Sequence, residues 1–230
     1  MGTSRKRNSQ SRAYEHIKQS IISLAVAPGM PLRAQEIAAK LKVSRTPVRE
    51  AFSRLEQEGL VVRQNDWGYV VRPLSPKDIL DLFTIRESLE VQAAREALPR
   101  VERDELGELG AHLDRAESLL KERRYPEFRA ACREFHLAIA ALSENELLFR
   151  LLATIRDRIL IVGAMHQDTR PERAREVLAE NRKILQAFGS GNAKSVVDAV
   201  LQHIRASRAS ILPPEASSAR GAPRRTGLNA

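Results

Sequence analysis

Residues 36 to 59 have the sequence EIAAKLKVSRTPVREAFSRLEQEG, which contains two helical patterns separated by a short turn. The first pattern places Ile37, Ala38 and Leu41 on one apolar face, and Val43 follows in the turn. The second has apolar residues spaced three and four apart, which are Val48, Ala51, Phe52 and Leu55. Two short helices joined by a tight turn predict a helix-turn-helix unit.

The start of the second predicted helix is polar and basic. Ser44 is placed to cap it, and Arg45, Thr46 and Arg49 follow on its exposed first turns. A recognition helix reaches bases and phosphates with this part, and an arginine can bind guanine through two hydrogen bonds. Lys42, in the turn, is expected to contact phosphate. The alternative is an ordinary helical hairpin with a solvated basic end.

The following segment, LVVRQNDWGYVVR at residues 60 to 72, has two β-branched runs around a polar turn with Asn65, Asp66 and Gly68. This pattern predicts a β-hairpin. Another helix is expected at 12 to 25, so the element order is that of a winged helix-turn-helix. Gly68 lies in the wing and is expected at the contact with DNA.

Residues 14 to 71 resemble the DNA-binding domain of the GntR family of bacterial transcription regulators. The matching pieces are Tyr14 with Ile17 and Ile21, Pro28-Gly29, the Ile37-Ala38 pair, VSRTPVREA at residues 43 to 51, LEQEGLV ending at Val61, and Gly68. The resemblance implies binding to double-stranded DNA.

Charge is distributed unevenly along the 230 residues, whose net charge is +9. Residues 1 to 72 hold 13 Lys and Arg against 6 Asp and Glu, a net charge of +7, whereas residues 73 to 212 hold 22 of each kind. A basic first part beside a neutral second part is expected of a protein that binds a polyanion at one end. A generally basic protein would not show that difference.

The sequence pattern also divides the chain. We expect a mobile basic arm at 1 to 11, the winged helix-turn-helix domain at 12 to 72, a linker at 73 to 76, an all-helical domain at 77 to 212 and a disordered tail at 213 to 230. Helices of the second domain are expected near 76–97, 102–123, 126–143, 146–163, 172–188 and 192–211. The predicted fold class is mainly α, a winged helix-turn-helix followed by a six-helix effector-binding bundle.

Other features concern the compartment. Cys132 is the only cysteine, which excludes an internal disulfide, and no apolar run approaches the roughly 18 residues of a membrane-spanning helix. The first residues, MGTSRKRNSQSR, are not followed by the apolar segment of a secretory signal. We therefore expect a cytoplasmic protein with no membrane partner.

Several polar residues of the second domain occupy positions on apolar helix faces. They are Arg86, His136, Asn181 and His203, one from each of four predicted helices, and Cys132 lies on the same apolar face one turn before His136. Isolated buried polar groups are costly unless they have partners, and one shared polar cavity would satisfy all of them. The alternative is that each is a core residue with its own local partner.

The second domain is similar to the helical effector-binding domain of the FadR-type (FCD) branch of the GntR family, in its shorter, VanR-like form. The matching segments are DLFTIRESLE at residues 81 to 90 and EFHLAIAALSENELL at residues 134 to 148. The resemblance implies a regulator, usually a repressor, that responds to a small organic acid. Two-fold symmetry of a homodimer implies a palindromic operator.

Many members of that branch bind a divalent metal through an Asp, a His four residues later and two further His. The resemblance places these positions at Cys132, His136, Asn181 and His203, so His136 and His203 match and Cys132 and Asn181 depart. A thiolate favours Zn²⁺, whereas an Asn carbonyl is a weak ligand. Both a zinc site and a metal-free polar pocket remain open at this point.

The absence of an Asp at position 132 also changes which class of effector the cavity favours. Arg86 with two histidines leaves the cavity neutral to positive, which favours a small carboxylate. A thiol- or metal-dependent hydrolase is a rival because Cys132 and His136 share a helix face, but no third group or Gly-rich loop supports it, and we expect no enzyme. An architectural DNA-binding protein with a purely structural second domain would not explain the inward polar residues.

Overall fold

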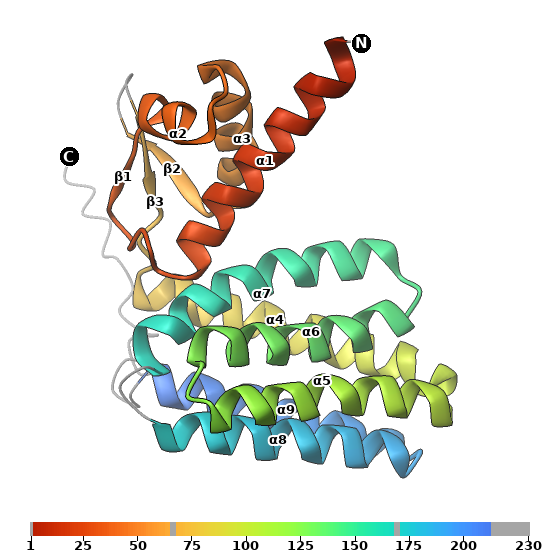
Figure 1. Ribbon diagram of the computed structural model, residues 1–230. Coiled ribbons are helices and arrows are strands. Elements are labelled where there is room, and N and C mark those ends of the chain that lie inside the picture. The colour runs from red at the N-terminus through yellow and green to blue at the C-terminus, as the bar shows by residue number, and fades with distance from the viewer. Residues whose placement is uncertain (1, 65–67, 168–170, 213–230) are drawn as a thin grey trace, which may run out of the picture.

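The computed structural model describes residues 2–64, 68–167 and 171–212. The chain forms two parts, a small domain that contains a sheet and a larger helical bundle on which it sits (Figure 1). The turn residues Asn65 and Asp66 and the expected tail at 213–230 lie outside the described residues. In the described part of the chain, no helix is long and apolar enough to cross a membrane.

The first domain has three helices and a three-stranded sheet. The helices are α1 (Gly2–Ile22), α2 (Ala34–Leu41) and α3 (Arg45–Gln57), and the strands are β1 (Pro31–Leu32), β2 (Val61–Gln64) and β3 (Gly68–Val71). The sheet order is β1-β3-β2 with antiparallel pairs, and Gln64 faces Gly68 at the tip of the predicted hairpin. The winged helix-turn-helix architecture is therefore confirmed.

The core of this domain forms from the apolar faces that the sequence predicts. Ile17 and Ile21 of α1 pack with Val48, Phe52 and Leu55 of α3, and all five are buried. At roughly 1.5–3 kcal/mol for each fully buried side chain of this size, this face stabilises helices too short to form alone.

Two local features differ from the sequence analysis. Residues 2 to 11, expected to belong to a mobile arm, form the first turns of α1, where no Pro or Gly after Gly2 interrupts the helix. The two-residue strand β1 was not expected, because Pro31 and Leu32 are too few to show a strand pattern. β1 is defined by its pairing with Val70 and Tyr69 of β3.

The second domain is a bundle of six long helices. They are α4 (Pro76–Ala97), α5 (Arg103–Lys121), α6 (Tyr125–Leu142), α7 (Glu146–Gln167), α8 (Pro171–Gly189) and α9 (Ala193–Ile211), and a 3₁₀ turn at Leu98–Arg100 follows α4. Every helix predicted after the linker is present. Ser75 caps α4: its hydroxyl accepts a hydrogen bond from the Asp78 backbone, and the Asp78 carboxylate accepts one from the Ser75 backbone.

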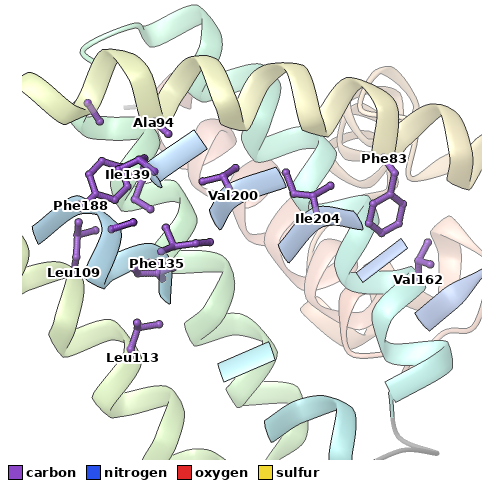
Figure 2. Close-up of a cluster of buried hydrophobic side chains, with 14 of the residues drawn as sticks. Phe83, Ala94, Leu109, Leu113, Phe135, Ile139, Val162, Phe188, Val200 and Ile204 are labelled. Atoms are coloured by element: carbon purple, nitrogen blue, oxygen red, sulfur yellow. The ribbon is translucent and has the colours of Figure 1, made fainter. Parts of the chain in front are cut away.

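The bundle core consists of side chains from all six helices. Figure 2 shows part of it, including Phe83 of α4, Phe135 of α6 and Ile204 of α9, each fully buried. Helix α9 packs against both α4 and α8. Because of this packing, polar residues on the inner faces of α4, α6, α8 and α9 are brought close together.

Helix α7 joins the two domains. It packs against α1, and its Ile161 belongs to the apolar core of the first domain (Figure 1). The buried carboxylate of Asp157, also on α7, forms an ion pair with Lys18 of α1 at 2.5 Å and a second one with Arg133 of α6 at 2.7 Å. The first domain is thus attached to the bundle through α7.

Candidate functional site

The structure offers two candidate surfaces, one on the first domain and one inside the second. On the first domain, Arg45, Thr46 and Arg49 are exposed at the start of α3, and Lys42 is exposed in the turn before it. These side chains lie on the exposed side of α3, while the opposite side of the helix packs in the core of the domain. This is the arrangement that a recognition helix needs, with its amino-terminal end available to DNA.

Ser44 and Lys42 show how the turn is built. Ser44 is the N-cap residue of α3 and has an extended backbone, but its side chain makes no capping hydrogen bond, so its hydroxyl is free to meet another partner. Lys42 ends α2 in the left-handed conformation, with φ of 54°. This conformation turns the chain sharply from one helix to the next.

The wing adds residues that the sequence analysis did not name. Arg63 of β2 and Tyr69 of β3 line a hollow of about 280 Å³ together with Arg49 of α3 and Gly68. The Tyr69 ring stacks on Phe52 with centroids 4.7 Å apart, which fixes the wing against the recognition helix. Arg63 and Gln64 are both exposed at the end of β2, and their polar character beside the turn could have indicated this.

The second candidate surface is a cavity of about 70 Å³ inside the bundle. Its lining includes Cys132 and the four polar residues predicted from the helix faces, which are Arg86, His136, Asn181 and His203. All five are buried. The imidazole rings of His136 and His203 stack with centroids 5.0 Å apart. The four helices therefore do share one polar cavity.

Glu90 holds the cations of the cavity together. One carboxylate oxygen accepts a hydrogen bond from Arg86 Nε at 2.6 Å, and the other accepts one from Arg156 at 2.8 Å and lies 3.0 Å from Nδ1 of His136. Burial raises the pKa of Glu90, but the charges of Arg156 and Arg86 outweigh that effect and hold the pKa well below its ordinary value. Glu90 is therefore ionised at neutral pH.

A second carboxylate orients His203. Glu180 Oε2 lies 2.8 Å from Nδ1 of His203, and Arg173 binds both oxygens of Glu180 at 2.6 and 2.9 Å. Nδ1 of His203 must therefore carry the proton, which leaves a lone pair on Nε2. That lone pair accepts a hydrogen bond from Arg86, whose terminal nitrogen is 3.0 Å away.

His136 has the same tautomer with a different neighbour. Its Nδ1 donates to Glu90, so its Nε2 must accept, yet Asn181 Oδ1 lies 3.1 Å from it while Asn181 Nδ2 is buried without a hydrogen-bond partner. Exchanging the amide oxygen and nitrogen of Asn181 gives every group a partner. Nδ2 then donates to His136, and Oδ1 faces the Cys132 thiol, with which Asn181 also interacts.

Burial determines the protonation of the remaining groups. It lowers the pKa of His203 to about 4 and that of His136 well below its ordinary value, so both rings are neutral at pH 7. It raises the pKa of Cys132 to about 12 and lowers that of Arg156 to about 9. At neutral pH the guanidinium cations of Arg86 and Arg156 thus share the Glu90 carboxylate beside a neutral Cys132 thiol, and Arg129 and Arg133 also line the cavity.

These donors do not fit a metal ion. A metal would need the Nε2 lone pairs of His136 and His203, and both already accept hydrogen bonds, from Asn181 and Arg86. Cys132 is a thiol rather than a thiolate ligand at neutral pH. Among the residues described, no three His, Cys, Asp or Glu side chains are grouped closely enough to hold an ion.

Two known family descriptions match this chain, one in each domain. The description "Bacterial regulatory proteins, gntR family" matches residues 9–71, and the description "FCD domain" matches residues 81–206. The chain belongs to the GntR family, in the branch with an FCD domain. It is a DNA-binding transcription regulator, and its helical domain is of the kind that binds ligands.

Individual relatives agree with this placement in the GntR family. The chain is 33% identical over 151 residues to the Nta operon transcriptional regulator of Aminobacter aminovorans, a match that covers 60% of this chain and only 65% of that protein. It is 24% identical over 195 residues to the HTH-type transcriptional repressor RspR of Escherichia coli K12, covering 84% of each. The solved structure of E. coli McbR/YncC has the same fold, with a TM-score of 0.81 at 20% identity over 88% of this chain and 96% of that one.

In this GntR-family chain, the charged residues that contact the predicted cavity residues were not predicted from the sequence. Glu90 lies four residues after Arg86 on the inward face of α4, so helical spacing alone could have found it. Arg156 and Asp157 interrupt the apolar face of α7, which is also a visible signal. Glu180 and Arg173 were hidden because each lies at the polar edge of α8 and depends on α9 for its contacts.

Proposed function

We propose that this regulator represses transcription from a palindromic operator and releases it when a small organic acid enters the cavity of the helical domain. The observation that carries the DNA-binding half is the exposed group Arg45, Thr46 and Arg49 at the start of α3, beside the wing. Repression is also the role printed in the name of the RspR relative. The site of action is the cytoplasm, where the operator is.

The residues have different roles in this proposal. Arg45, Thr46 and Arg49 read base edges, because a side chain at the start of a recognition helix reaches the major groove. Lys42, Ser44 and Gly68 contact the phosphate backbone, through an ammonium group, a free hydroxyl and a backbone amide. Such contacts position the protein and carry no sequence information.

Replacing Arg45 or Arg49 by alanine is expected to weaken binding to the preferred duplex by about 1–3 kcal/mol while random DNA is affected much less. Lys42→Ala should weaken both duplexes alike and reduce the salt dependence of log K by about 1. Fluorescence anisotropy measures both, with a duplex selected in vitro from a random pool as the specific site. Arg103→Ala, an exposed arginine of α5, is the matched control. Equal losses on selected and random DNA for the two α3 variants would contradict base reading.

We also propose a homodimer that pairs through α4 and α7. Leu147 and Leu151 are one helical turn apart on α7 and expose 61% and 48% of their surface, and Ile85 of α4 exposes 51%. Ile155 continues the row on α7 and lies in the same surface hollow as Ile85. A row of apolar side chains on two packed helices is characteristic of a subunit interface.

Leu151→Arg is expected to convert the dimer to monomers, because each subunit would bring a buried, unpaired charge into the interface. Light scattering coupled to size-exclusion chromatography measures the mass. Met30→Arg places the same charge on an equally exposed apolar residue of the DNA-binding domain and should leave the mass unchanged. A dimer that persists in Leu151→Arg would place the interface elsewhere.

A further inference from the structure

We infer that the cavity binds a small carboxylate directly through Arg86 and Arg156 and holds no resident metal ion. This inference rests on the proposed function as an effector-responsive regulator, and it names the class of effector and the groups that bind it. It also separates this chain from metal-dependent proteins of similar fold. The argument rests on hydrogen-bond geometry, on charge and on the two side chains at positions 132 and 181.

Two carboxylates orient the histidines as they would in a metal site, but hydrogen-bond donors lie where the metal ion would be. Glu90 and Glu180 hold the Nδ1 atoms of His136 and His203, which is how metal-binding histidines are commonly oriented. The Nε2 atom of His203, which would face the ion, instead accepts a hydrogen bond from the Arg86 guanidinium at 3.0 Å. The Arg86 guanidinium therefore lies on the side of Nε2 that a metal ion would have to bind.

The side chains at positions 132 and 181 supply neither the carboxylate nor the third imidazole of the family's metal site. Cys132 is 6% exposed and Asn181 is fully buried, so no charged group from solvent can reach either side chain. A divalent ion placed between His136, His203, Cys132 and Asn181 would also face the two guanidinium groups of Arg86 and Arg156, which line the same cavity. Glu90 is the one carboxylate in direct contact with both. Electrostatic repulsion therefore opposes the ion.

The same charges favour an anion. Arg86 and Arg156 together carry one more positive charge than Glu90 neutralises, and both line the cavity. Nε of Arg156 is buried and has no hydrogen-bond partner among the described residues. A carboxylate can accept two parallel hydrogen bonds from a guanidinium, and a cavity of about 70 Å³ admits only a small acid.

Metal content tests the first half of the inference without DNA. Elemental analysis of the purified full-length protein should find substoichiometric metal, and added Zn²⁺, Mn²⁺ or Ni²⁺ should leave its melting temperature unchanged. The double variant Cys132→Asp/Asn181→His supplies an acid and a third imidazole and should gain a stoichiometric ion with a raised melting temperature. Asn181→Gln is the matched control, which keeps the amide and should gain no ion. Stoichiometric metal in the wild type that His203→Gln removes would overturn the inference.

Thermal shift with defined anions tests the second half. In the presence of a chelator, at least one of acetate, L-lactate and malonate should stabilise the wild type, and Arg86→Met should lose that stabilisation. Arg86→Lys, which keeps the charge but not the planar pair of donors, should retain only part of it. Overturning results are stabilisation by none of the three acids, stabilisation only by inorganic phosphate, a need for added metal, or full response in Arg86→Met. None of these results bears on operator binding, so the DNA-binding half of the proposed function is tested separately.

Discussion

Glu90→Ala is expected to destabilise the helical domain by about 3–5 kcal/mol, because it leaves two buried guanidinium groups without their shared counterion. Glu90 contacts Arg86 at 2.6 Å, Arg156 at 2.8 Å and His136 at 3.0 Å, and it is 4% exposed. Chemical denaturation followed by circular dichroism measures the loss. Few single substitutions elsewhere in the bundle would remove partners from three buried groups at once.

Two variants distinguish the effect of losing the Glu90 charge from the effect of losing the volume of its side chain. Glu146→Ala removes an exposed carboxylate paired with Arg150 at 3.0 Å and should change stability by less than about 1 kcal/mol. Glu90→Met combined with Arg156→Met removes one charge of each sign and keeps the volume, so it should recover much of the stability lost in Glu90→Ala. If the double substitution is no more stable than Glu90→Ala, unpaired charge is not the cause.

The fold could be predicted from the sequence because its signals are local. The apolar face of α3 and the Ser75-Pro76 start of α4 are each contained in a few neighbouring residues. Strand β1 was missed for the opposite reason, since its two residues have no pattern and become a strand only by pairing with β3. The continuation of α1 to Gly2 was missed because basic composition was interpreted as a mobile arm.

The cavity could be predicted only in part, for a similar reason. Polar residues on apolar helix faces are visible in the sequence, and Arg86, His136 and His203 were found in this way. Which carboxylate meets which cation depends on how the helices pack, as with Arg156 of α7 reaching Glu90 of α4 across 66 residues. The tautomers of the two histidines follow from those contacts, so the sequence alone left the metal question open.

The ion pair between the domains leads to the second prediction. Asp157 is 1% exposed and is bound by Lys18 at 2.5 Å and by Arg133 at 2.7 Å. Its chain neighbour Arg156 lines the cavity and binds Glu90, so adjacent residues of α7 contact the cavity and the DNA-binding domain. Lys18 also donates to Tyr14 at 2.8 Å and lies 3.3 Å from Glu58, the C-cap residue of the recognition helix α3.

Asp157→Ala should therefore destabilise the fold by about 1.5–3 kcal/mol for each charged hydrogen bond lost and uncouple the two domains. It removes the carboxylate that half-buried Lys18 and Arg133 share and leaves them, among the described residues, only Glu58 and Glu134 as charged partners. Scanning calorimetry should resolve one transition in the wild type and two in the variant. Lys18→Met and Arg133→Met form a matched pair, since each removes one cation from Asp157, but only Lys18 crosses the boundary. Lys18→Met should split the transition and Arg133→Met should only lower it. If the two variants melt alike, Asp157 stabilises the bundle without joining it to the DNA-binding domain.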